Sequence, residues 1–215
     1  MQKLVVLLGV ILGLASAAAG QGQTLRYEAY IAGIRAGGAT VQLDISADDY
    51  VIVGTASADG LLDIFANWRV EFNAQGKIVD ARAELTEFHY VERDDLNQRE
   101  VTVRDGVLHV VENGKQLSTR SALPGTDLLT ALFVAPQCST AKLLHAGRQS
   151  FRLRRLESVN EAMAICKYDV LDDAGEHFQV TAEFSMVGGL TIPVKLSYEG
   201  LLSGWLELVQ PEVGN

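Results

Sequence analysis

Short segments of this chain alternate apolar and polar residues, and this alternation limits the fold more than any other feature of the sequence. Segments 40–45, 99–104 and 191–199 alternate over their whole length. The pattern is longest in segment 176–186, where the apolar positions are Phe178, Val180, Ala182, Phe184 and Met186. Because successive side chains of a strand point to opposite faces, each segment predicts a strand with one buried and one solvated face. Antiparallel sheets are the usual setting for such strands.

Glycine-containing turns separate these segments. Asp105-Gly106 and Asn113-Gly114 suit two-residue hairpins, because both central residues of such turns need a positive φ. Further turns are predicted at Asp59-Gly60, 73–76, 172–175 and Gly188-Gly189. About eleven strands result, and regular short strands of this kind predict a barrel, half-barrel or sandwich. We therefore expect an all-β, mostly antiparallel fold, built as a curved sheet, β-spiral or open barrel.

Two positions interrupt the alternation. Within 79–91 the apolar phase slips between Leu85 and Phe88, as it does where a β-bulge adds one residue to a strand. Pro193 lacks a backbone N–H and predicts an edge strand, a strand start or another bulge.

One segment, residues 126–135, predicts a helix. Thr126 and Asp127 can cap it, and Pro136 follows it. Its apolar stripe consists of Leu128, Leu129, Leu132 and Phe133. We expect this single short helix to pack on the open end or the concave face of the sheet.

The N-terminal residues have the pattern of an export signal. Lys3 precedes an apolar run over 4–14, and small residues follow as far as Ala19. We expect residues 1–19 to be a cleaved signal peptide and residues 20–215 to form a single β-rich domain in the periplasm. The apolar run is shorter than the roughly 20 residues that span a bilayer, and no second long run follows, so no transmembrane segment is predicted.

The charge balance limits the partners. The chain has 18 Lys and Arg against 27 Asp and Glu, a formal net charge of −9, and loss of Lys3 with the signal makes it one charge more acidic. Sequence-independent nucleic-acid binding needs a basic surface, so no nucleic-acid partner is expected. Adsorption to an anionic lipid surface is disfavoured for the same reason.

The chemistry-bearing residues predict a disulfide and no catalytic site. Cys138 and Cys166 are the two cysteines, and an even pair in an exported protein predicts a disulfide. No Cys-x-x-Cys, His-Glu-x-x-His or Gly-x-Ser-x-Gly motif is present. We therefore expect no catalytic residues, no metal ligands and no cofactor, and no enzyme activity; a Ser-His-Asp set assembled only in space is the alternative.

One cluster of cations stands out in this acidic chain, formed by Arg148, Arg152, Arg154 and Arg155. Arg152 and Arg154 would share one face of a strand, opposite Phe151 and Leu153. This face is either solvated or a contact for an acidic partner or a phospholipid head group.

Large apolar residues on the one-sided strands have two interpretations. They form the core, or they line a cavity of the kind that ligand-binding barrels enclose. The residues of the second interpretation, the candidate apolar ligand face, are Phe65, Trp68, Phe88, Leu129, Phe133 and Phe184.

From Arg26 the chain reads RYEAYIAGIRAGGATVQLDI. The matching positions are Tyr27, Glu28, Tyr30, Gly33, Ala36 and Gly37, with similar features at 60–72, 127–132 and 192–194. In these motifs the chain resembles a family of exported bacterial proteins, domain of unknown function 3108. The resemblance implies a periplasmic, mostly antiparallel fold that curves like a spiral or open barrel, and it implies no catalytic residues. By analogy of fold, similar curved sheets in periplasmic lipoprotein carriers hold acyl chains on a concave apolar face.

Two functional hypotheses follow. The chain is a non-catalytic module that binds a lipid, another apolar ligand or a lipidated protein. Alternatively, it is a cell-envelope integrity protein that acts through protein–protein contacts at a sheet edge or at Arg152 and Arg154. The sequence makes no prediction of the oligomeric state.

Overall fold

The computed structural model describes residues 22–60, 67–122, 125–135, 138, 143–146, 149–159, 164–200 and 203–213. The predicted signal peptide, Phe65 and Arg148 lie outside these residues. The strands are β1 (Gln23–Ile31), β2 (Ile34–Ile45), β3 (Asp49–Ala58), β4 (Arg69–Val79), β5 (Arg82–Arg93), β6 (Gln98–Arg104), β7 (Val107–Glu112), β8 (Lys115–Ser121), β9 (Thr126–Asp127), β10 (Leu143–His145), β11 (Ser150–Val159), β12 (Ala164–Asp172), β13 (His177–Val187), β14 (Leu190–Glu199) and β15 (Gly204–Val213). Helix α2 (Leu128–Phe133) lies between β9 and β10 in the chain.

All of these strands belong to one 15-stranded sheet, in the order β8-β7-β6-β5-β4-β3-β2-β1-β15-β14-β13-β12-β11-β10-β9. Neighbouring strands are antiparallel except for the short parallel pair β9–β10. The predicted all-β, mostly antiparallel class is thus confirmed, with more strands than the eleven expected. Strands β9 and β10 have two and three residues, too few for alternation to reveal them.

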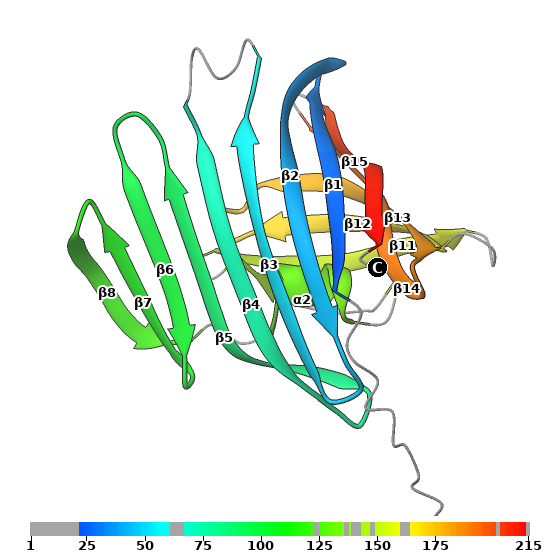
Figure 1. The fold of residues 1–215 in the computed structure, drawn as a ribbon. Helices are drawn as coiled ribbons and strands as arrows, with labels where there is room; N and C mark the ends of the chain where they lie inside the picture. The colour runs from blue at the N-terminus through cyan, green and yellow to red at the C-terminus, as the bar shows by residue number, and fades with distance from the viewer. Residues whose placement is uncertain are drawn as a thin grey trace, which may run out of the picture.

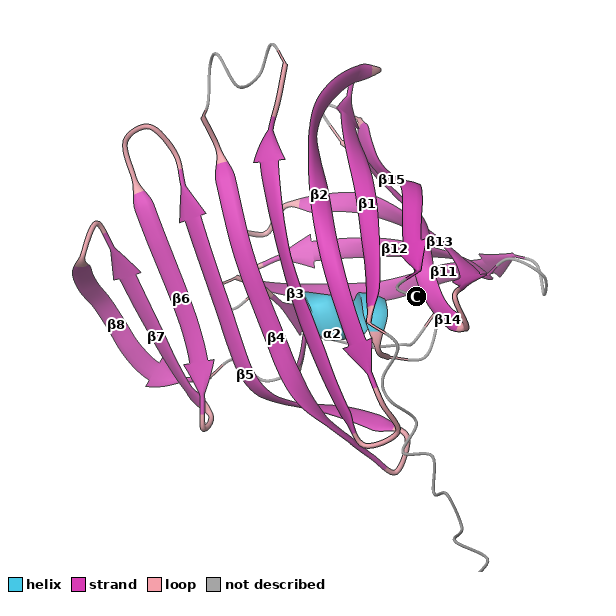
Figure 2. Ribbon diagram, viewed as in Figure 1, coloured by secondary structure: helices cyan, strands magenta, loops and turns pink. Residues whose placement is uncertain are grey.

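The sheet is strongly curved, so that its two halves face each other. Strands β1–β8 form one curved layer, and β11–β14 cross behind it (Figure 1). Helix α2 lies between the two layers (Figure 2). The join between the halves is the pairing of β1 with β15, the first and last strands.

Most of the predicted turns are confirmed. Asp105-Gly106 and Asn113-Gly114 have positive φ at both residues and close the β6–β7 and β7–β8 hairpins. The turn predicted at 73–76 is wrong, because these residues lie inside β4. A glycine is required at position 76 because no side chain fits there. A Cβ would meet the Glu84 carbonyl oxygen and lie 2.5 Å from the Tyr50 hydroxyl. The chain reverses at Asp80-Ala81 instead, again with positive φ at both residues.

Both predicted irregularities are β-bulges. Gln75 pairs with Glu87 and Gly76 with Leu85, so Thr86 is the extra residue that shifts the phase in β5. Phe184 pairs with Pro193 and Glu183 with Lys195, so Val194 is the extra residue beside the proline. Such bulges increase local bending and twist, as a sheet of this curvature requires.

The concave side of the sheet carries the core. One cluster joins buried residues of β1–β7, α2 and β14: Leu25, Tyr27, Val41, Leu43, Tyr50, Ile52, Ala74, Phe88, Val101, Val103, Leu108, Val110, Phe133 and Ile192. A smaller cluster joins β12 and β13: Cys166, Tyr168, Val170, Ala182 and Phe184. The alternating apolar residues of the two halves therefore point toward the same interior.

Candidate functional site: two apolar cavities beside helix α2

Polar contacts hold helix α2 against the concave face. The Asp127 carboxylate caps it, accepting a hydrogen bond from the Thr130 backbone N–H at 2.9 Å. The Thr130 hydroxyl donates to the Tyr50 hydroxyl of β3 at 2.9 Å. The Phe133 ring packs edge-on against Tyr27 of β1, with centroids 6.4 Å apart. The predicted helix, its Asp127 cap and its packing on the sheet are thereby confirmed, although the helix covers only Leu128–Phe133 of the predicted residues 126–135, because Thr126 and Asp127 form strand β9.

Two apolar cavities flank this helix. Cavity A has a volume of about 520 Å³. Its walls come mainly from β11–β14, with residues that include Phe151, Leu153, Tyr168, Val170, Phe178, Val180, Ala182 and Phe184. Cavity B has a volume of about 470 Å³. Its walls come mainly from β1–β4, with residues that include Ala36, Ala39, Val41, Ala56, Trp68 and Phe72. No charged residue of the described part of the chain lines either cavity.

Helix α2 separates the cavities and contributes to both. Leu128 and Ala131 line cavity A, Leu129 and Phe133 line cavity B, and Leu132 lines both. The other walls common to the two cavities are Ala29, Ile31, Leu196 and Leu206. The cavities therefore adjoin, and Leu132 lies in the partition between them.

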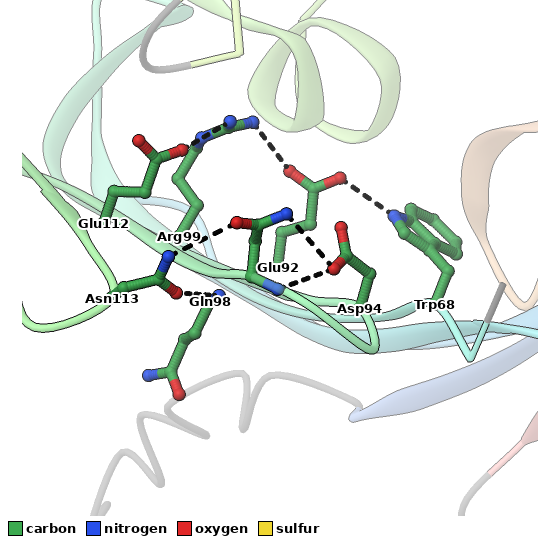
Figure 3. A network of polar contacts seen from close by, with 8 residues as sticks. Trp68, Glu92, Asp94, Gln98, Arg99, Glu112 and Asn113 are labelled. Atoms are coloured by element: carbon green, nitrogen blue, oxygen red, sulfur yellow. Dashed lines mark hydrogen bonds and ion pairs between the residues drawn. The ribbon is translucent and has the colours of Figure 1, made fainter.

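A polar network holds Trp68 at the wall of cavity B (Figure 3). The Trp68 indole N–H donates to Glu92 Oε1 at 2.9 Å. Arg99 lies between two carboxylates, donating to Glu92 at 3.3 Å and to Glu112 at 2.8 Å. The hydrogen bond to Glu112 raises the pKa of Arg99, so this guanidinium remains charged. The network thus fixes the position of an aromatic wall from outside the cavity.

A buried acidic and basic pair lies under the helix N-terminus. Asp127 and His145 occupy paired positions of β9 and β10 and are 0% and 2% exposed. Burial raises the pKa of Asp127 and lowers that of His145, because each charged form loses hydration. The mutual attraction of the two groups opposes both shifts. Oδ2 of Asp127 has no hydrogen-bond partner among the described residues.

The predicted disulfide is present between Cys138 and Cys166, whose Cα atoms are 5.4 Å apart. Cys138 lines cavity A, and Cys166 is fully buried in β12. The bond therefore ties Cys138, a wall residue of cavity A just beyond the helix, to strand β12.

The residues of the predicted ligand face separate into three groups. Trp68, Leu129 and Phe133 line cavity B, and Phe184 lines cavity A. Phe88 lines neither cavity: it is 2% exposed and packs edge-on against His145 in the core. Phe65 lies outside the described residues.

Two members of the predicted arginine cluster, Arg152 and Arg154, lie on the outer face of β11. Phe151 and Leu153 point into cavity A, so Arg152 and Arg154 of the same strand are exposed on the opposite side. Arg154 forms an ion pair of 2.9 Å with Asp169 on the neighbouring strand β12.

A third hollow, of about 810 Å³, lies on the opposite face of β1–β4 from the core. It is polar, and its wall includes Arg26, Glu28, Arg35, Thr40, Thr55, Ser57, Asp59, Arg69 and Glu71. Arg35 pairs there with Glu28 at 3.1 Å and with Asp59 at 2.8 Å. Its positive and negative side chains balance, so it has no preference for a ligand of one charge.

Several wall residues were missed by sequence reasoning, although some of them carried a readable signal. Tyr168 and Val170 of cavity A alternate with the polar residues Lys167 and Asp169 along β12, a pattern as clear as that of β13. No sequence pattern predicts that both faces of a six-residue helix line cavities.

Among the described residues, no group of three or more His, Cys, Asp and Glu side chains could hold a metal ion. No helix in the described ranges combines the length and apolar character needed to cross a bilayer.

Taken as a class, the molecule is a curved antiparallel sheet wrapped around a short helix and apolar cavities. A solved structure with this architecture is the β-barrel-like protein of a domain of unknown function, DUF1849, from Brucella abortus. The two superpose with a TM-score of 0.54 at 11% identity, covering 92% of this chain and 99% of the other. At that identity the likeness shows the fold alone. No model of a known family matches the sequence, and no curated protein sequence matches it.

Proposed function

We propose that this protein is a non-catalytic binding module for a lipid or another apolar ligand. The observation that carries the proposal is the pair of adjoining cavities A and B, of about 520 and 470 Å³, with no charged residue of the described ranges in their walls. Protein cavities that bind small molecules have volumes of roughly 300 to 1,000 Å³ and mostly apolar walls. We further propose that the protein acts in the periplasm, where exported lipids and lipidated proteins would need to be shielded from water.

The energetic argument is that of the hydrophobic effect. Transferring a methylene group from water into an apolar site is favourable by about 0.8 kcal/mol, so a long hydrocarbon chain gains enough to bind without any polar contact. The walls are apolar on both sides of α2, so they offer this gain along their whole length. The analogy of fold with periplasmic lipoprotein carriers, which hold acyl chains on a concave apolar face, supports the same function.

The test is to purify the mature protein from the periplasm without detergent, extract it with organic solvent and analyse the extract by mass spectrometry. We expect a lipid at near-stoichiometric amount. An unrelated periplasmic protein purified in the same way gives the background. An extract no richer in lipid than this background, together with no uptake of added palmitic acid, would contradict the proposal.

A second candidate is a cell-envelope integrity protein that works through a protein partner. It is favoured by the exposure of Arg152 and Arg154 on the outer face of β11, away from the cavities. Affinity capture from the periplasm with the wild type and with R152E/R154E tests it. The loss of one captured protein in the variant would support this role, and identical partner sets would remove the arginines from it.

A further inference from the structure

We infer that the ligand is a diacyl lipid, with one acyl chain in cavity A and the other in cavity B. This inference rests on the proposed function and makes it specific. It follows from three properties of the site: the size of each cavity, the partition between them and the nature of their walls.

The volumes match one acyl chain in each cavity. An apolar cavity of about 150 Å³ accommodates benzene, which sets a requirement of about 25 Å³ for each carbon atom. At this density cavities A and B, of about 520 and 470 Å³, hold roughly 20 carbon atoms each. A palmitoyl chain fits within either limit, and the near equality of the volumes suits a ligand with two similar chains.

The partition argues against a single rigid ligand. Leu132 of α2, with Leu196 and Leu206 of β14 and β15, stands between the cavities and lines both. A rigid ring system large enough to fill both volumes would have to displace these side chains. Two flexible chains joined to adjacent carbons of one glycerol unit can instead pass on either side of the partition.

The walls of the two cavities are matched in chemistry. Each is built mainly from aliphatic and aromatic side chains, and in the described residues neither offers a charged group that would orient a polar head inside. Both cavities therefore select for hydrocarbon, and the head group is expected to remain outside them.

The two tryptophans of the chain allow the cavities to be observed separately. Trp68 lines cavity B and Trp205 lines cavity A. The W205F variant therefore reports on cavity B through Trp68, and the W68F variant reports on cavity A through Trp205. We expect dipalmitoyl phosphatidylglycerol to change the fluorescence of both variants with the same midpoint.

Substitutions that fill one cavity test the two-chain arrangement directly. V180F fills part of cavity A, and A56F fills part of cavity B. The matched controls are Q179F on β13 and V53F on β3, because Gln179 and Val53 are exposed positions of the same strands. Circular dichroism and the thermal midpoint show which variants are folded.

Native mass spectrometry and fluorescence titration with two probes give the result. Wild type and both controls should bind two molecules of palmitic acid or one of dipalmitoyl phosphatidylglycerol. V180F and A56F should each bind one palmitic acid and lose at least about tenfold in affinity for the diacyl lipid.

Two outcomes would overturn the inference while leaving the proposed function intact. The first is a single palmitic acid per wild-type protein that is lost in both filled variants, since the cavities would then be one site for one chain. The second is a filled variant that binds the diacyl lipid as the wild type does. If neither probe binds the wild type, the proposed function itself fails.

Discussion

At the scale of a single residue, Asp127 stabilises the fold through one carboxylate oxygen and destabilises it through the other. Its Oδ1 atom caps α2, while the absence of a partner for Oδ2 in the described structure leaves a buried carboxylate poorly compensated. Its folded pKa is raised above the ordinary value of 3.8, so the ionised group costs stability at neutral pH and this cost disappears as the pH falls through the folded pKa.

We predict that D127A and D127N differ in stability. D127A removes the cap and should lower the free energy of unfolding by about 1 kcal/mol at pH 7. D127N keeps the acceptor oxygen and removes the desolvated charge, so it should be more stable than D127A by a similar amount. Urea unfolding followed by circular dichroism measures both values. Equal losses in the two variants would mean that the charge itself is needed in the fold.

His145 makes the fold sensitive to acid. Its folded pKa lies below the ordinary value of 6.5, so the unfolded chain binds a proton that the folded chain does not. Stability at this site is therefore complete above about pH 6.5 and is lost as the pH falls below it, by at most about 1.4 kcal/mol per pH unit.

We predict that H145Q reduces the loss of stability between pH 7 and mildly acidic conditions. The free energy of unfolding, measured by urea titration at several pH values, gives the slope for wild type and variant. H177Q is the matched control, because the His177 side chain is exposed. An unchanged slope in H145Q would assign the acid sensitivity to other groups.

At the scale of elements, the disulfide is the main covalent restraint on the region around α2. It joins residues 28 apart in the sequence, and closing a loop of this length stabilises a fold by about 3.5 kcal/mol in the chain-entropy model. Cys138 lines cavity A, so the restraint acts on the proposed site as well as on the fold.

We predict that C138S lowers the thermal midpoint of the oxidised protein by several degrees, because the unfolded chain regains the freedom of this loop. Differential scanning calorimetry with and without reductant measures the effect. Reduced wild type should melt close to the variant. A variant that melts with the oxidised wild type would show that the bond contributes no stability.

At the scale of the whole molecule, the fold depends on the pairing of its first and last described strands. Strand β1 pairs with β15 over nine residue pairs from Gln23–Val213 to Ile31–Gly204, and this pairing joins the two curved halves into one sheet. Within it, the rings of Tyr30 and Trp205 stack with centroids 4.9 Å apart.

We predict that W205A lowers the free energy of unfolding by roughly 2 kcal/mol, through lost apolar burial and lost ring stacking. Unfolding in urea should remain a single transition, because the two halves share one interior. L117A on the edge strand β8 is the control, since Leu117 is 56% exposed and should change stability by less than about 0.5 kcal/mol. Two separate transitions in W205A would show that the halves unfold independently.

The sequence alone determined the local structure. Alternation in β13 and β14, the positive-φ pairs Asp105-Gly106 and Asn113-Gly114, the bulge at Thr86 and the capped helix are all decided by residues close together in the chain. The wrong turn at 73–76 illustrates the limit, because Gly76 is required by its distant neighbours Tyr50 and Glu84 rather than by a turn. The sequence does not distinguish a glycine that is required because a side chain would clash from a glycine that is required for a positive φ in a turn.

Only the tertiary structure decided how these elements enclose space. Three features depend on segments that are separate in the chain. They are the pairing of β1 with β15, the position of Leu132 between the two cavities, and the burial of Asp127 beside His145. Alternation predicts which residues face the interior of the protein. It does not distinguish residues that pack in the core from residues that line a cavity, because both kinds are apolar and face inward. Trp68 and Phe88 looked equivalent in the sequence, and the curvature of the sheet placed one beside a cavity and the other in the packed core.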